Sequence, residues 1–357
     1  MTEEQGMTYK KAGVNISEAD KFVAMIKARV VRAWPKMAKE IGGFAGRAKI
    51  PRSIRGYRVK DLYSSTDGVG TKLKIAALLG DFSGIGYDAV AMSAVDAYVA
   101  GSRPVYLLDY FATGKLIAEK HIAVIDSLIE ACQMIGCKIL GGETAEMPDY
   151  FKYDWMIDLI TFVIGFDDPI LLLEPMRAGQ KVYGWPSSGP ASNGYSLLRK
   201  VFGLNDSPSK VRRKLDRDYL ELYGEYGTTL GEALLVPTDI WITAIDMAIL
   251  EGTKFSGHAH ITGGGLVENP PRILPSEFKM VIDRGAWKRP PIFGLTQRKG
   301  KVPLEDMDRT FNNGIMVVSV VSGEGRTLDK TSAIEIGIIE RRREGEKAVE
   351  LIGKYND

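Results

Sequence analysis

Apolar residues recur along the chain at helical and at strand spacings, and the two kinds of segment alternate. Helical spacing predicts helices at 17–33, 87–101, 122–135, 192–202 and 239–250. Short apolar, aromatic or β-branched runs predict strands at 57–66, 104–112, 137–142, 156–166, 181–185, 315–321 and 332–340. The run at 315–321 is apolar throughout, which predicts a central strand. A charged, tyrosine-rich stretch at 206–228 is predicted to be a surface excursion.

The segment 166–180, between two predicted strands, is the best candidate for a junction between domains. The chain has 357 residues, a length that favours two domains over one. We therefore expect an N-terminal domain at 1–168 and a C-terminal domain at 169–357.

Composition and charge exclude several classes of protein. A formal net charge of +2 is too close to neutral to indicate a nucleic-acid partner. No apolar stretch reaches the roughly 18 residues that a membrane span needs, and the first residues lack the apolar core of a signal peptide. The two cysteines, Cys132 and Cys137, suggest neither a zinc site nor a disulfide framework. We expect a cytoplasmic protein with reduced thiols.

The segment TDGVGTK combines Asp67, two glycines and Lys72 directly after a predicted strand. It lacks the spacing of a Walker loop and of a dinucleotide fingerprint. A phosphate could nevertheless bind here, to the glycine N–H groups, the start of the helix and the lysine. Asp67 would favour a phosphate that carries Mg²⁺, because Mg²⁺ prefers carboxylate and phosphate oxygens. The alternative is a strand–turn–helix junction with an aspartate cap and a solvated lysine.

Further acids stand in apolar surroundings. Asp96 lies within a predicted buried helix, Asp109 within a predicted buried strand, and Glu143 and Glu146 follow two glycines. A buried acid without a partner is costly, so each is expected to have a cation, a metal ion or hydrogen-bond donors. One such acid is more often structural, but several together favour a Mg²⁺–nucleotide site.

Two glycine-rich segments in the second half, 187–196 and 262–269, offer backbone amides for a second anionic group. Three consecutive glycines can instead form a tight structural bend. His258 and His260 precede them, and we interpret their spacing as placing them on opposite faces of a strand, without a shared metal. We expect His258 to be a core histidine and His260, beside the glycine turn, to be the functional candidate.

The residues of these motifs, and their order along the chain, resemble those of one family. STDGVGTKL, LDYFATGKL, GGETAEMP, SSGPASNGYSLLRKV, AHITGGGLVENPPRILP and RTFNNGI together closely resemble the phosphoribosylformylglycinamidine cyclo-ligases, also called aminoimidazole ribonucleotide synthetases. The resemblance extends from about residue 7 to about residue 340. Any one motif alone would fit the wider ATP-using superfamily.

The resemblance implies a fold and a reaction. The fold is α+β, with an N-terminal ATP-binding half that forms a β-barrel between the subunits of a homodimer, and a C-terminal half with a mixed sheet and helices. The reaction closes the ring of formylglycinamidine ribonucleotide to aminoimidazole ribonucleotide in purine biosynthesis, using ATP and Mg²⁺ and releasing ADP and phosphate. For such chemistry the protein must mainly position the reacting groups and neutralise the phosphate charge.

The resemblance also assigns residues to roles. Lys72, Asp67 and His260 are the catalytic candidates, and Asp67, Asp96 and Glu143 are the candidate Mg²⁺ ligands. The expected ATP contacts are Lys27, Gly68, Gly70, Thr71, Lys72, Asp109, Thr113, Gly114, Lys115, Gly141, Gly142 and Glu143. The expected ribonucleotide contacts are Ser192, Asn193, Gly194, Tyr195, Ser196, Thr262, Gly263, Gly264, Gly265, Glu268 and Asn269.

Four positions depart from the family pattern: Val95, Arg103, Ala191 and Asp239 stand where asparagine, glutamate, histidine and arginine are usual. Two alternatives therefore stay open. The alternatives to a cyclo-ligase are another ATP-using member of the superfamily and a divergent paralogue that binds nucleotide in a regulatory or assembly role. The intact GGETAEMP and LDYFATGKL segments argue against the first alternative.

Overall fold

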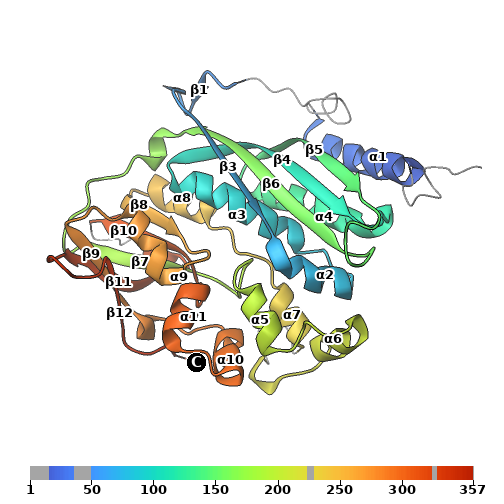
Figure 1. The fold of residues 1–357 in the computed structure, drawn as a ribbon. Coiled ribbons are helices and arrows are strands. Elements are labelled where there is room, and N and C mark those ends of the chain that lie inside the picture. Colours follow the sequence, from blue (N-terminus) through green and yellow to red (C-terminus); the bar gives the residue numbers. More distant parts are fainter. Residues whose placement is uncertain (1–15, 36–49, 223–228, 324–327, 357) are drawn as a thin grey trace, which may run out of the picture.

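The computed structural model describes residues 16–35, 50–222, 229–323 and 328–356. Two β-sheets and the helices around them form an α+β protein (Figure 1). A two-stranded ribbon, β1 (Ser53–Ile54) with β2 (Tyr57–Arg58), precedes the first sheet. Within the described residues, no helix is both long and apolar enough to cross a membrane.

The first sheet has four strands in the order β3 (Leu62–Gly68), β6 (Ile157–Asp167), β4 (Ser102–Thr113) and β5 (Lys138–Glu146). Of the neighbouring strands, only β4 and β5 pair in parallel. Helices α2 (Leu73–Leu79), α3 (Ile85–Val99) and α4 (Ala118–Met134) cover one face, and α1 (Ile16–Ala33) packs on α4 (Figure 1). No described helix packs on the opposite face, where the side chain of Phe162 is 40% exposed.

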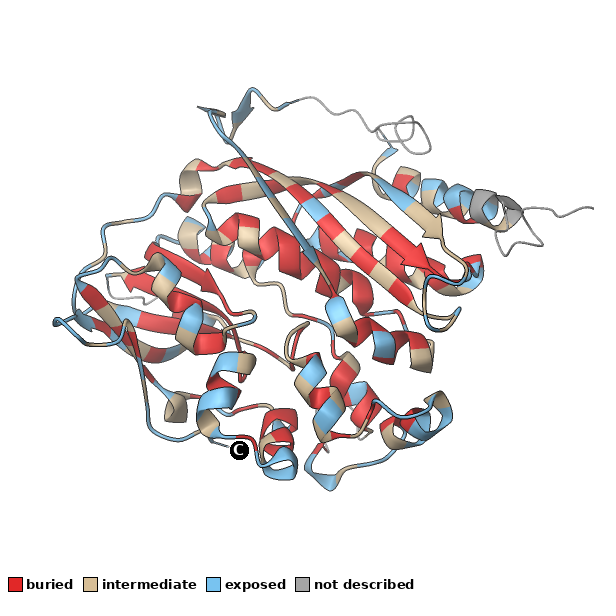
Figure 2. Ribbon diagram, in the orientation of Figure 1, coloured by how far each residue is buried: buried red, intermediate tan, exposed pale blue. Residues whose placement is uncertain are grey.

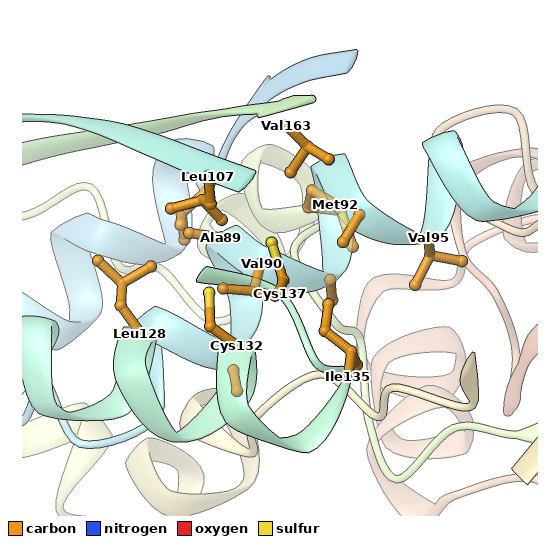
Figure 3. Close-up of a cluster of buried hydrophobic side chains, with 14 of the residues drawn as sticks. Ala89, Val90, Met92, Val95, Leu107, Leu128, Cys132, Ile135, Cys137 and Val163 are labelled. Atoms are coloured by element: carbon orange, nitrogen blue, oxygen red, sulfur yellow. The ribbon is translucent and has the colours of Figure 1, made fainter. Parts of the chain in front are cut away.

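Helix α3 lies at the centre of the molecule because its residues are small and apolar on every side. It packs against β3, β6 and α4, and also against β8 of the second sheet (Figure 2). Cys132 and Cys137 are free and buried in the same core, beside Val90 (Figure 3). That core continues to Trp185 of the second sheet, so the two halves share one hydrophobic cluster.

The second sheet has six strands, in the order β12, β9, β11, β7, β10 and β8. Their bounds are β7 (Lys181–Pro186), β8 (Lys254–His260), β9 (Phe278–Asp283), β10 (Ile315–Ser322), β11 (Ile334–Arg341) and β12 (Val349–Ile352). Strand β10 pairs with both β7 and β8, which confirms the predicted central strand at 315–321. Only β12 and β9 pair in parallel.

The remaining helices lie in the second half of the chain. They are α5 (Tyr195–Val201), α6 (Pro208–Leu215), α7 (Leu230–Leu235), α8 (Ile242–Leu250), α9 (Gly265–Glu268), α10 (Pro291–Gly300) and α11 (Leu304–Thr310). Short 3₁₀ turns lie at 70–72, 169–171, 220–222, 270–273, 284–286 and 328–330. Helices α5, α6, α7, α10 and α11 pack into a second apolar cluster, which also includes Ile75 of α2.

Several predicted element boundaries differ from the structure, two of them at turns with positive φ. The strand predicted at 57–66 begins only at Leu62, because a turn at Arg55 and Gly56, both with positive φ, folds the preceding residues into the β1–β2 ribbon. The helix predicted from residue 192 begins at Tyr195, because Gly194 adopts a left-handed conformation with φ 75°. Part of the predicted excursion at 206–228 forms α6, and residues 223–228 lie outside the described part.

Candidate functional site

Asp67, Asp96 and His260 form the candidate centre, which we call the carboxylate–histidine cluster. They come from the end of β3, from α3 and from the last residue of β8. The Nδ1 atom of His260 lies 2.7 Å from Oδ1 of Asp96. Partial burial raises the pKa of Asp67 and the charge of Asp96 raises it further, whereas the Gly68 N–H and His260 lower it. Three residues that are distant in sequence therefore interact in one place.

The position of α3 between the two sheets brings this cluster together. Asp67 pairs in register with Thr161, whose hydroxyl donates to the Ala89 carbonyl of α3, so this row of the sheet faces the helix. On the other side of α3, His260 contacts Asp96, and the ring of His258 lies 6.4 Å from that of Tyr98.

The predicted opposite orientation of the two histidines is wrong, because residues two apart on a strand share a face. A hydrogen bond of 2.8 Å joins Nδ1 of His258 to the Ser319 hydroxyl. Burial lowers the pKa of His258 to about 4. It is a core histidine, as expected. The Nε2 atom of His260, in contrast, is buried and has no hydrogen-bond partner among the described residues.

The two glycine-rich loops meet beside the cluster. The Asn193 amide donates to the Met92 sulfur at 3.9 Å, one helical turn before Asp96, and a Cβ added to Gly263 would lie 3.8 Å from Oδ1 of Asn193. A Cβ at Gly265, with φ 58°, would lie 2.0 Å from the Asp308 carbonyl oxygen, so this bend requires glycine. Loops 187–194 and 262–265 therefore form one surface next to Asp96.

Asn269 fixes the shape of the second loop. Its amide group donates to the carbonyl oxygens of Thr262, Gly263 and Gly265 at 3.3, 3.4 and 2.9 Å. Its Oδ1 atom is buried and has no hydrogen-bond partner in the described part of the chain, and the same is true of Oγ of Ser192 in the first loop. Because buried polar atoms are rarely unpaired, these atoms and Nε2 of His260 are the ones best suited to bind polar groups of a ligand.

Other predicted ribonucleotide contacts already have protein partners. The Tyr195 hydroxyl donates to the Leu234 carbonyl at 2.6 Å, and Glu268 forms an ion pair with Arg309 at 2.5 Å. Ser196 is exposed. Tyr195 thus holds α5 on α7.

Lys72 lies in a buried network rather than at the surface. Its Nζ donates to Asp88 Oδ1 at 2.8 Å and to the Val236 carbonyl at 2.7 Å, and both charged side chains are 0% exposed. Thr238 donates to the same carboxyl oxygen through its N–H and its hydroxyl, at 3.0 and 2.6 Å. Burial lowers the pKa of Lys72 and raises the pKa of Asp88. The network joins the turn before α2, α3 and the segment after α7.

Within one chain, Glu143 does not lie near Asp67 and Asp96, the other two predicted metal ligands. Asp67, Thr161, Asp109 and Gly142 form one row across the four strands, so Asp67 and Gly142 stand at opposite edges of the sheet. Glu143 follows Gly142 and points to the other face, where it is exposed. Among the described residues, no three histidine, cysteine or acidic side chains are grouped so that they could hold a metal ion.

Asp109 occupies the middle of this row. Its burial raises the pKa of the carboxyl group to about 7, and the nearby charge of Glu143 adds to the shift. A Cβ at Gly142 would lie 2.3 Å from its Oδ1, so Gly142 gives the carboxyl group its space. Asp109 thus faces the helices, away from Glu143.

The remaining predicted ATP contacts lie on several separate elements. The turn with Gly68, Gly70 and Thr71 and the turn from Thr113 to Lys115 follow β3 and β4, which end at the same side of the sheet. The Thr113 hydroxyl donates to the Met156 carbonyl at 3.2 Å. Gly141 lies in β5. Lys27 is exposed on α1, which packs on α4 rather than near Asp67.

The structure gives two of the unusual residues a clear role. Arg103 forms a bidentate ion pair with Asp246 of α8 at 2.5 and 2.8 Å and donates to Asp168 at 2.9 Å. Asp239 accepts hydrogen bonds from the N–H and hydroxyl of Ser188 at 2.7 and 3.1 Å. The first interaction links the two halves, and the second shapes the loop at 187–194.

The other two unusual residues pack in the interior. Ala191 is buried with a left-handed φ of 56°, and Val95 is buried in the core.

Sequence reasoning missed Asn312 as a positioning residue. Its amide donates to the Ser187 hydroxyl and to the Gly189 carbonyl, both at 3.0 Å, and it is 1% exposed. The only signal in the sequence was its place in the RTFNNGI motif.

Comparisons with known proteins give a consistent result. Residues 54–166 match the model "AIR synthase related protein, N-terminal domain", and residues 177–349 match the corresponding C-terminal domain. A phosphoribosylformylglycinamidine cyclo-ligase of Caldanaerobacter subterraneus subsp. tengcongensis is 44% identical over 89% of this chain and 91% of that protein. The one of Syntrophotalea carbinolica is 40% identical over 99% of this chain and 100% of that protein.

Solved structures share the fold at lower identity. The hydrogenase maturation protein HypE in complex with ATP has a TM-score of 0.62 and 17% identity, over 96% of this chain and 92% of that one. A thiamine-monophosphate kinase from Stenotrophomonas maltophilia has a TM-score of 0.59 and 14% identity, over 92% and 96%. The two domain matches and the cyclo-ligase relatives above show that the chain belongs to the AIR synthase-related family, as a member of its phosphoribosylformylglycinamidine cyclo-ligase branch.

Proposed function

We propose that this chain closes the ring of formylglycinamidine ribonucleotide to aminoimidazole ribonucleotide, with ATP converted to ADP and phosphate. Family membership over nearly the whole chain supports this reaction. The structural observation that carries the proposal is the meeting of the carboxylate–histidine cluster with the two glycine-rich loops. Acids suited to a metal–triphosphate thus stand beside backbone amides suited to a second phosphate.

Asp67 and Asp96 fit a magnesium ion that is shared with a nucleotide. Their charges are close enough to raise the pKa of Asp67, and a divalent cation would relieve that repulsion. Mg²⁺ is usually held by one or two carboxylates together with substrate phosphates, so two protein ligands suffice. When bound, Mg²⁺ neutralises phosphate charge during phosphoryl transfer.

His260 and the loops would orient the ribonucleotide. Asp96 fixes the imidazole ring through Nδ1, which leaves Nε2 to contact a polar group of the substrate. The N–H groups of the 263–265 bend and the amide of Asn193 would bind the substrate phosphate and ribose. In the family reaction the formyl oxygen takes the γ-phosphate and the amidine nitrogen then displaces it, so fixed positions of these groups matter most.

The uncovered face of the first sheet supports a homodimer. It carries Leu62, which is 60% exposed, and Phe162, together with Tyr106 and Leu108 on β4. A contiguous apolar sheet face is a typical interaction surface, and a second copy of this sheet would cover it as a barrel. Glu143 points to the same face, so its contact with nucleotide or metal is a prediction that depends on this dimer.

Replacing Phe162 by Asp is expected to convert the dimer to a monomer, because a charge would then be buried at the centre of the contact. Sedimentation equilibrium of the full chain measures the mass. Leu220→Asp, at a residue 81% exposed in the other half, is the control and should remain dimeric. If Phe162→Asp sediments with the same mass as the unmodified chain, a dimer through this face is ruled out.

A direct assay tests the reaction. The purified chain with formylglycinamidine ribonucleotide, ATP and Mg²⁺ should form ADP and aminoimidazole ribonucleotide in equal amounts, and omission of the ribonucleotide should stop ADP formation. Nucleotide binding without any turnover would instead support the divergent paralogue.

A further inference from the structure

A small cavity of about 140 Å³ lies between α2, the loop joining β5 to β6, α5 and α6, apart from the carboxylate–histidine cluster. Figure 1 shows α5 and α6 beside the end of α2. Three cationic side chains line it: Lys74 from α2, Lys152 from the loop and Arg199 from α5. The cavity therefore gathers positive charge from three separate parts of the chain.

Arg199 lacks a full set of partners. Its Nη1 atom donates to Asn205 at 2.8 Å, but its Nε atom is buried without a hydrogen-bond partner among the described residues. Burial lowers the pKa of Arg199, because the charged form loses hydration. Among the described residues, neither Lys74 nor Lys152 forms an ion pair.

One acid, Asp206, also lines the cavity, but its charge is already balanced. Lys210 and Lys214 lie 3.6 and 3.5 Å from its carboxyl oxygens, and the Ser207 N–H donates to it. These interactions, led by the Ser207 N–H, lower the pKa of Asp206, so it stays ionised within its own lysine cluster. The cavity thus keeps an excess of positive charge.

Aromatic rings make one wall of the cavity rigid. Tyr153 and Trp155 stack with centroids 5.1 Å apart and planes 7° from parallel, and Lys152 Nζ lies 5.3 Å from the Tyr153 centroid. The volume is below the 300–1,000 Å³ typical of sites for whole cofactors. It suits a phosphate-sized group whose remainder extends into solvent.

We propose that this cavity binds a phosphate group, either free or as the end of a small phosphate monoester, and that this second anion site links α2 to α5. Arginine and lysine side chains bind phosphate through charged hydrogen bonds, and Arg199 has a buried donor for one. Helix α2 follows the turn that contains Lys72, and α5 follows the loop that ends at Gly194. An occupied cavity therefore holds two loops of the catalytic region at a fixed separation.

Calorimetric titration of the full chain with inorganic phosphate, and separately with glycerol 3-phosphate, tests the site without turnover. Arg199→Gln and Lys152→Gln should each raise the dissociation constant about tenfold or more, the change expected for one lost charged hydrogen bond. Lys200→Gln removes the same charge from the exposed neighbour of Arg199 and should change nothing. Tighter binding of glycerol 3-phosphate than of phosphate would identify a phosphate monoester as the ligand. Equal binding of the two would identify the free phosphate ion.

Lys152→Gln changes an exposed loop residue, so it remains informative if Arg199→Gln does not fold. Phosphate held only at the glycine-rich loops 187–194 and 262–265 would bind all three variants and the unmodified chain equally, and that result would overturn the proposal. Because binding is measured without substrate, a chain that fails the ring-closure assay can still bind phosphate here, and the two failures remain distinguishable.

Discussion

Replacing Lys72 by Met is expected to lower the free energy of unfolding by about 3–5 kcal/mol, because Asp88 would keep a buried charge without its ion-pair partner. Both side chains are fully buried, so water cannot take the place of the ammonium group. The Val236 carbonyl would lose its donor as well. Urea denaturation of the full chain at neutral pH, followed by circular dichroism, measures the loss.

A double substitution provides the control. Lys72→Met combined with Asp88→Asn removes both charges, while the Asn carbonyl still accepts from the N–H and hydroxyl of Thr238. The double variant should therefore be more stable than Lys72→Met alone. If Lys72→Met instead keeps its stability and loses ATP turnover, Lys72 contacts phosphate, as the sequence motif suggests.

Asp67→Asn is expected to lower kcat/KM for ATP by about 10²–10³ and to raise the Mg²⁺ concentration needed for half-maximal rate. The amide is a weaker ligand for Mg²⁺ than the carboxylate, whereas its oxygen can still accept the hydrogen bond from the Gly68 N–H. Initial rates over a Mg²⁺ titration measure both effects.

Asp61→Asn is the matched control, since it removes an acid one residue before the same strand and should leave the Mg²⁺ dependence unchanged. Identical Mg²⁺ curves for the two variants would show that Asp67 only supports the turn after β3. A changed curve for Asp67→Asn alone would support its place at the metal.

The sequence was most informative where burial makes a polar group costly. Asp96 stands among apolar residues of a buried helix, which predicts a partner; the structure provides His260, although the Asp96 side chain itself is 44% exposed. His260 was distinguishable from His258 by its place next to a glycine turn, and His258 is indeed a core residue. These inferences needed only local surroundings.

Contacts between distant segments could not be predicted in this way. Lys72 pairs with Asp88 and reaches Val236, and nothing near either residue in the sequence indicates the other. The separation of Glu143 from Asp67 within one chain could not be predicted either. Alternation along a strand shows which face a residue lies on, but only the strand order shows that β3 and β5 are opposite edges of the sheet.

The central position of α3 has a consequence for how the molecule opens. Both sheets pack against this helix. The two halves therefore cannot separate without exposing the apolar sides of α3 to water. Its backbone amides should accordingly exchange with deuterium only through global unfolding, and more slowly than those of α1, which packs mainly on α4. The same helix that carries Asp96 would then be the last part of the chain to lose its structure.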